Sequence, residues 1–111
     1  IIVDFHAEAT SEKLAMLCHL DGRVSALVGT HTHVQTADQR ITENKTAYIT
    51  DLGMTGVVDS ILGVKKDIIY NRIVNYCSDR FENAEGRCMI NGIILETDNN
   101  GRAVGIERIN E

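Results

Sequence analysis

Two short apolar runs on either side of a helix-like segment constrain the fold of this chain more than any other feature. Residues 1–5 and 24–28 are rich in Ile, Val and Leu, and residues 10–20 between them have helical spacing. Strands joined through a helix form a βαβ unit with parallel strands and a right-handed crossover. The sequence therefore predicts an α/β fold. The nearly continuous apolar character of residues 1–5 predicts a strand covered on both faces.

The predicted helix has recognisable ends and one apolar stripe. Thr10 or Ser11 can cap its start, and Asp21-Gly22 provides a stop. At helical spacing, the side chains expected to be buried are Leu14, Leu17 and Cys18.

The rest of the chain predicts mixed strands and a second helix. Residues 46–50 have strand character, and residues 65–76 have apolar side chains at helical spacing. Two further apolar runs, residues 88–95 and 103–109, flank the turn sequence Asp98-Asn99-Asn100-Gly101. An Asn-Gly step between two such runs predicts a C-terminal β-hairpin.

Histidines follow both strands of the predicted βαβ unit. His6 ends the first strand, and Gly29-Thr30-His31-Thr32-His33 follows the second. The carboxyl ends of parallel strands meet at one sheet edge, where α/β folds bind ligands. Imidazole is the commonest metal ligand, and on an extended backbone His31 and His33 would point to the same side. The pattern favours a metal site at this edge, although two solvated loop histidines would give the same local sequence.

Composition narrows the possible functions. A net charge of -5 argues against broad nucleic-acid binding, and no apolar run is long enough to span a membrane. The three cysteines, Cys18, Cys77 and Cys88, are odd in number and form no CxxC pair. They are typical of reduced thiols, and we expect a cytoplasmic protein.

The start of the sequence suggests a piece of a longer protein. The first residue is Ile1 rather than Met, and it already lies within a predicted strand. Only 5% of the residues are aromatic, which predicts a thin core. We expect residues 1–111 to form part of one domain.

Four segments together resemble one known family. These are VDFHAEATSEK at residues 3–13, LDGRVSA at residues 20–26, VGTHTHVQTAD at residues 28–38 and TDLGMTG at residues 50–56. They resemble the YmdB-type branch of the calcineurin-like metallophosphoesterases. The resemblance covers essentially the whole chain and corresponds to the C-terminal half of the family protein. It implies half of a four-layer α/β/β/α sandwich.

The resemblance also implies a phosphodiesterase with two divalent metal ions. Members of the family hydrolyse 2′,3′-cyclic nucleotides and other phosphodiesters with iron or manganese, and zinc or magnesium are the alternatives. His6 and His31 match ligands of the second metal, and His33 matches a ligand of the first.

The family's carboxylate and Asn ligands, and the histidine that protonates the leaving group, have no counterpart here. We therefore expect no catalytic residue in this chain, partial or no metal occupancy, and no activity from the chain alone. The nearest acids, Asp4 and Glu8, are better explained as structural, and no substrate-binding residue is predicted. The expected partners are a small phosphodiester or cyclic nucleotide, the missing N-terminal half and further copies of the chain, but not a membrane.

Two other functions fit parts of the pattern. A catalytically silent domain that pairs with a partner chain needs no metal chemistry. A metal-dependent amidohydrolase also has an HxH motif at a strand end, but it requires an eight-stranded barrel. Asp51 is open to two interpretations. It can orient a metal-binding histidine through a hydrogen bond, or it can stabilise the turn at residues 51–56.

Overall fold

The computed structural model describes residues 1–111, which divide into two units. Unit 1 comprises residues 1–54 and 91–110, and unit 2 comprises residues 55–90 together with Glu111.

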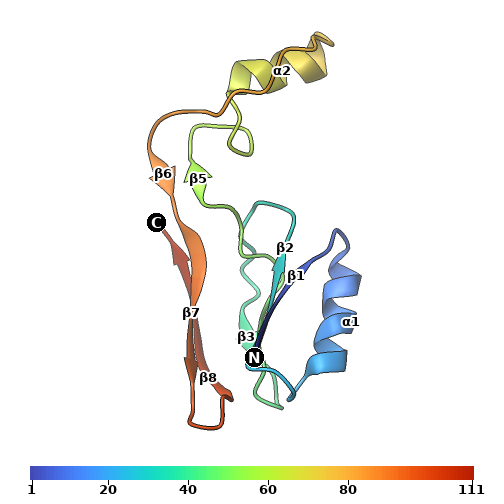
Figure 1. Cartoon of the computed structure of the whole chain (residues 1–111), viewed down its shortest axis with the longest axis vertical. Coiled ribbons are helices and arrows are strands. Elements are labelled where there is room, and N and C mark those ends of the chain that lie inside the picture. The colour runs from blue at the N-terminus through green and yellow to red at the C-terminus, as the bar shows by residue number, and fades with distance from the viewer. The chain divides into compact units, whose positions relative to one another are not determined.

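A four-stranded sheet forms the centre of unit 1, with the strand order β1-β2-β4-β3 (Figure 1). Strands β1 (Ile2–His6), β2 (Ala26–Thr30) and β4 (Ala47–Ile49) are parallel, and the short β3 (Arg40–Ile41) is antiparallel to β4. Helix α1 (Thr10–Leu20) connects β1 to β2. The predicted βαβ unit is therefore confirmed.

The predicted buried stripe of α1 is only partly correct. Leu17 is buried against Leu27 and Tyr48, but Leu14 and Cys18 are exposed, and Lys13 is buried in their place. Residues four apart share a helix face, so the face that contains Lys13 and Leu17 turns toward the sheet. The apolar pattern misplaced the stripe because a charged residue occupies one of the buried positions.

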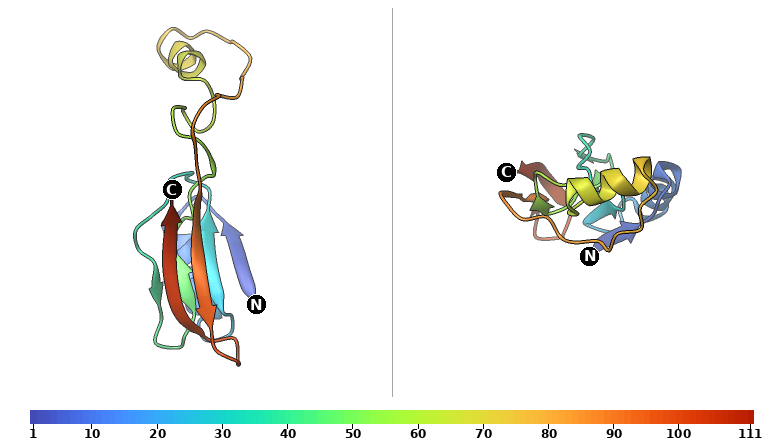
Figure 2. Two further views of the ribbon diagram at one scale, coloured as in Figure 1. Left: turned by 90° about the vertical axis from the view of Figure 1, so that its left-hand side faces the viewer. Right: turned by 90° about the horizontal axis from the view of Figure 1, so that it is seen from above.

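A β-hairpin covers the other face of the sheet (Figures 1 and 2). It is formed by β7 (Asn91–Thr97) and β8 (Ala103–Asn110), as the Asn-Gly turn predicted. Three alanines with no exposed surface form the core between hairpin and sheet, namely Ala26, Ala47 and Ala103. Unit 1 thus has three layers: a helix, a sheet and a hairpin.

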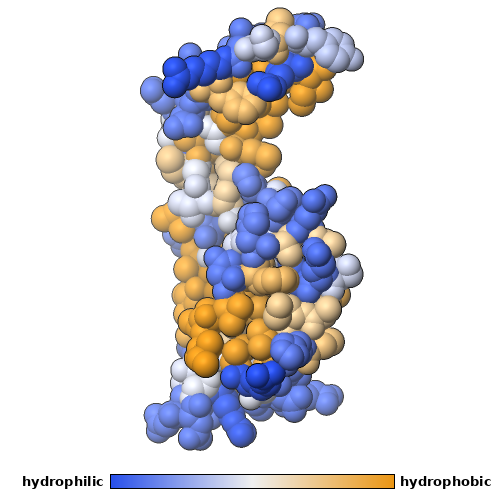
Figure 3. All heavy atoms as spheres, turned by 45° about the vertical axis from the view of Figure 1, so that its right-hand side comes forward, coloured by the Kyte–Doolittle hydropathy of each residue, from blue (hydrophilic) through white to orange (hydrophobic).

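The prediction that the first strand is covered on both faces is wrong. Val3 and Phe5 on one face of β1 pack against the core, whereas Ile2 on the other face is 64% exposed. Other apolar side chains of unit 1, including Ile94 and Val104, are also exposed. Figure 3 shows a patch of apolar atoms on the surface of the molecule. The apolar run at residues 1–3 shows no alternation, so the sequence could not indicate that only one face of this strand is packed.

Unit 2 consists of a two-stranded sheet and one helix. Strands β5 (Gly56–Val57) and β6 (Cys88–Met89) are antiparallel, and α2 (Lys66–Val74) lies between them in the sequence. The helix is confirmed but ends before Tyr76, which has a positive φ of 55°. The run predicted as one strand over residues 88–95 is divided between β6 and β7. Neither α1 nor α2 is long and apolar enough to cross a lipid bilayer.

Candidate functional site

His6 and His31 lie side by side at the carboxyl edge of the parallel strands. His6 is the last residue of β1 and pairs in register with Thr30, the last residue of β2. His31 follows directly, and the two imidazole ring centroids are 5.1 Å apart with the rings tilted by 52°. The expectation that histidines from the two strand ends meet is confirmed for this pair.

A chain of two hydrogen bonds connects the His6 ring to Thr30 and then to Asp4. The Thr30 hydroxyl donates a hydrogen bond to Oδ1 of Asp4 at 3.0 Å. Nδ1 of His6 lies 3.1 Å from the same hydroxyl oxygen. Asp4 is thus linked to the His6 ring through the Thr30 hydroxyl.

The loop after β2 has an unusual backbone. His31 has a φ of 137° and His33 a φ of 66°, values that residues with a side chain seldom adopt. Strand β2 ends at Thr30, so the backbone from His31 to His33 is not extended. The expectation that His31 and His33 point to the same side depended on an extended backbone and therefore does not apply. Such conformations cost on the order of 1–3 kcal/mol each and persist only where surrounding contacts enforce them.

Asp51 supplies those contacts from the end of β4. Its Oδ2 atom accepts hydrogen bonds from the Thr32 N–H at 2.9 Å and from Nζ of Lys13 at 3.1 Å. Its Oδ1 atom accepts one from the Gly53 N–H at 2.9 Å. Asp51 therefore connects the backbone between His31 and His33 to helix α1.

The Lys13–Asp51 pair is an ion pair in the interior of unit 1, since each side chain is only 1% exposed. Burial works to raise the pKa of the Asp51 carboxyl, but hydrogen bonds from Thr32, Gly53 and Lys13 outweigh it and hold the pKa below the ordinary value. Asp51 is accordingly a carboxylate at neutral pH. Asp51 thus forms the turn, as one interpretation expected, and its partners there are Lys13, Thr32 and Gly53. That it orients a metal-binding histidine stays a prediction.

Gly29 leaves the space that this connection needs. A Cβ atom at this position would lie 1.8 Å from the carbonyl oxygen of Thr50 and 2.8 Å from Cδ of Lys13. Any side chain here would collide with the neighbouring strand and with the lysine stem. Close packing thus explains why a glycine stands two residues before His31.

Lys13 was not predicted from the sequence to be a residue near this site. Its only sequence signal is its position four residues before Leu17, on the buried side of α1. A lysine on that face requires a buried acid, and Asp51 is 38 residues away in the sequence.

The two adjacent histidines fit part of a metal site. Neutral imidazole nitrogens suit borderline divalent cations such as Mn²⁺, Fe²⁺ and Zn²⁺. However, no three His, Cys, Asp or Glu side chains of the chain lie close enough together to hold one ion. The structure brings His6 and His31 together and adds neither His33 nor an acid to them. The assignment of His6, His31 and His33 as metal ligands therefore stays a prediction.

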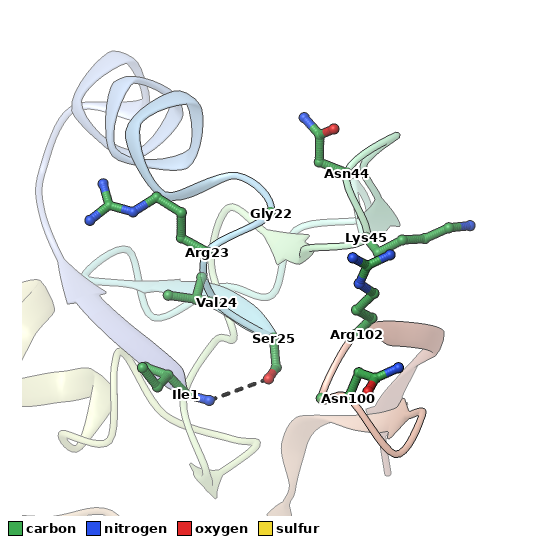
Figure 4. A pocket seen from close by; sticks show the side chains of 10 residues that line it. Ile1, Gly22, Arg23, Val24, Ser25, Asn44, Lys45, Asn100 and Arg102 are labelled. Atoms are coloured by element: carbon green, nitrogen blue, oxygen red, sulfur yellow. Dashed lines mark hydrogen bonds between the residues drawn. The ribbon is translucent and has the colours of Figure 1, made fainter.

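The cavity drawn in Figure 4 lies away from the histidines. It measures about 630 Å³ and is bordered by Arg23 and Ser25, which precede β2, and by Lys45 and Arg102. The side chains that line it come from the amino ends of the strands. It therefore forms no part of the histidine site.

Comparison with known proteins gives a consistent match over the whole chain. A family model described as "YmdB-like protein" matches residues 1–109. The "2′,3′-cyclic-nucleotide 2′-phosphodiesterase" of Bacillus subtilis is 54% identical over 98% of the chain. A "putative phosphatase/phosphodiesterase" of Mycoplasma pneumoniae is 42% identical over 93% of the chain. The chain spans only 42% and 37% of these two relatives.

Two solved structures share the fold. A hypothetical protein from Thermus thermophilus has a TM-score of 0.89 at 40% identity, over 99% of this chain and 43% of its own. A phosphatase from Mycoplasma pneumoniae has a TM-score of 0.90 at 40% identity, over 98% of this chain and 40% of its own.

Proposed function

The chain belongs to the YmdB-like protein family, and on that premise we propose that it carries histidine ligands of a metal-dependent phosphodiesterase. The family match over residues 1–109 confirms the resemblance that the DFHAE and GTHTHVQTAD segments indicated. The fold is mixed α/β, as expected, and similar to that of a phosphatase.

The proposed substrates are phosphodiesters, cyclic nucleotides in particular. Support comes from the names of the relatives, one a 2′,3′-cyclic-nucleotide phosphodiesterase and another a phosphatase/phosphodiesterase. Because the chain spans about two fifths of these proteins, the activity proposed is that of a longer assembly to which this chain contributes.

One observation carries the proposal. His6 and His31 come from the carboxyl ends of adjacent parallel strands, and their ring centroids are 5.1 Å apart. Open α/β sheets bind ligands at this edge. Two neutral imidazoles so placed can provide two nitrogen ligands to one divalent ion.

In the proposed site, His6 and His31 hold one ion and His33 a second. A pair of such ions, iron or manganese or alternatively zinc or magnesium, would bind the phosphate oxygens and stabilise an in-line displacement. The role of this chain is to hold and orient imidazole nitrogens. Histidines alone bring no negative charge, so the remaining acidic ligands must come from outside these residues.

A silent pairing domain remains the second candidate. The absence of any group of three possible ligands favours it for the chain on its own. The amidohydrolase alternative requires a closed eight-stranded barrel, whereas the sheet here is open and ends at β1 and β3.

Metal binding by the full chain tests the proposal directly. Calorimetric titration with Mn²⁺ should detect binding that His6→Ala and His31→Ala each weaken by at least about tenfold. His19→Ala is the matched control, because His19 lies at the end of α1 and contacts Arg23. Equal affinity in all four proteins would contradict the proposed site.

Catalysis is tested with 2′,3′-cyclic AMP and Mn²⁺. We expect the chain alone to hydrolyse it no faster than buffer containing the metal. Addition of the remaining part of the Bacillus subtilis relative as a separate polypeptide should restore turnover. His33→Ala in that complex should lower the rate at least about 100-fold, the scale of a lost metal ligand. Strong activity from the chain alone, or full activity of the His33→Ala complex, would refute this assignment.

A further inference from the structure

We infer that Asp4 and Thr30 are positioning residues that fix His6 as the Nδ1–H tautomer and leave its Nε2 atom as the metal-binding nitrogen. The choice of metal-binding nitrogen rests on the proposed function, whereas the choice of tautomer follows from the hydrogen bonds alone.

The direction of each hydrogen bond settles where the protons lie. A carboxylate can only accept, so the Thr30 hydroxyl proton is directed to Asp4 at 3.0 Å. A hydroxyl has one proton, and the Thr30 oxygen can therefore only accept from the His6 ring at 3.1 Å. The contact requires a proton on Nδ1. In a neutral imidazole the other nitrogen, Nε2, then carries the lone pair.

The sheet itself holds this arrangement in place. Asp4 and His6 are two residues apart on β1 and so lie on the same face. Thr30 pairs in register with His6 on the adjacent strand. All three side chains thus belong to strand residues, unlike those of the loop that carries His31 and His33.

The ring is consequently turned with one nitrogen engaged and the other free. The His6 side chain makes no other hydrogen bond, and the His31 ring beside it makes none. Metal-binding histidines commonly donate their second ring N–H to an oxygen, which fixes tautomer and ring orientation. The carboxylate of Asp4 polarises the Thr30 hydroxyl and strengthens its acceptor character.

The test is ¹⁵N NMR of the imidazole side chains in the full chain, without metal, at about pH 8.5, where imidazoles are neutral. We expect His6 to be the Nδ1–H tautomer in the parent and in Thr30→Ser. Thr30→Val should abolish this preference. Asp4→Ala should weaken it, because the freed hydroxyl can then donate to Nδ1.

Thr97→Val is the matched control, since Thr97 is an exposed strand residue with no histidine partner. It should leave the His6 signals unchanged. A parent protein with the proton on Nε2, or a Thr30→Val variant with unchanged signals, would overturn the inference.

A titration with Zn²⁺ alone then separates this inference from the proposed function. Zn²⁺ should shift the Nε2 signal of His6, and Thr30→Val should weaken its binding about 10- to 100-fold. Zn²⁺ bound through Nδ1, or bound equally well by Thr30→Val, overturns the inference and leaves the metal site standing. If the tautomer is as expected but Zn²⁺ shifts no imidazole signal, the metal site is overturned and the tautomer assignment is upheld.

Discussion

The two histidines at the centre of the site are held in different ways. His6 is fixed by strand pairing and by the hydroxyl of Thr30. His31 follows the strand end and has a strained φ of 137°. Strained residues persist where surrounding contacts enforce them, and the hydrogen bond from the Thr32 N–H to Asp51 is such a contact beside His31.

Glycine at position 31 should relieve this strain. We expect His31→Gly to have an unfolding free energy about 1 kcal/mol higher than His31→Ala, since glycine adopts positive φ freely. Both variants should lose Mn²⁺ affinity. Urea denaturation followed by circular dichroism measures the difference.

The variants His19→Gly and His19→Ala provide a control, because here the glycine variant should have the lower unfolding free energy. His19 lies within helix α1, where glycine is less stable than alanine by about 1 kcal/mol. If His31→Gly were also the less stable of its pair, the loop would not be strained.

At this scale, the sequence predicted some residues and not others for physical reasons. The proximity of His6 and His31 could be predicted because the ends of parallel strands share one sheet edge, whatever the details of packing. Lys13 could not, because its buried position depends on a partner, Asp51, that only the folded chain brings near.

Between elements, the Lys13–Asp51 ion pair connects α1 to the loop that follows β4. Lys13→Met should lower the unfolding free energy by about 3 kcal/mol or more, because it leaves a buried carboxylate without its cation. Lys66→Met is the matched control: its partner Asp59 is exposed, and its loss should cost less than about 1 kcal/mol. Similar costs in urea denaturation would show that Asp51 does not need its lysine.

Asp38 contributes a pH-dependent connection between a loop and the end of β4. Burial works to raise the pKa of Asp38, but hydrogen bonds from the Thr36 and Thr50 hydroxyls and the Thr50 N–H hold it below the ordinary 3.8. Because the pKa of Asp38 is lower in the folded than in the unfolded chain, the carboxylate stabilises the fold. This contribution is complete above pH 3.8 and is lost as the pH falls through the pKa of the folded state.

Comparison with Asp38→Asn isolates this contribution. The parent should be more stable than the variant at neutral pH by about 1 kcal/mol, because the hydrogen bonds that are weakened are only partly buried. The difference should shrink as the pH falls below 3.8. Urea denaturation at a series of pH values measures it, and a difference independent of pH would contradict the assignment.

The elements that the sequence predicted are those with enough residues to show a period or a turn. The βαβ unit and the C-terminal hairpin are in this class. Strands β3 and β5 have two residues each and form only because a partner strand lies alongside. No periodicity exists in two residues, so such strands could not be predicted.

Over the whole molecule, the buried residues are distributed unevenly between the two units. The sheet, α1 and the hairpin bury nearly all of them, whereas Ile68 is the only buried residue of unit 2. Helix α2 also exposes Tyr70, Ile73 and Val74. The histidine site thus lies in the unit with the larger core, which suits a site that depends on fixed strand ends.

Hydrogen–deuterium exchange should reveal this difference. Segments with few buried contacts open with little free energy, so amides of α2 should exchange at least about 100-fold faster than those of β2 and β4. Helix α1 is the internal control, because it is also a short helix but buries Leu17 and Lys13 against its sheet. Its amides should be protected well above those of α2. Equal protection of the two helices would contradict this expectation. It would mean that exposed residues of unit 2 stabilise α2 in addition to the buried Ile68.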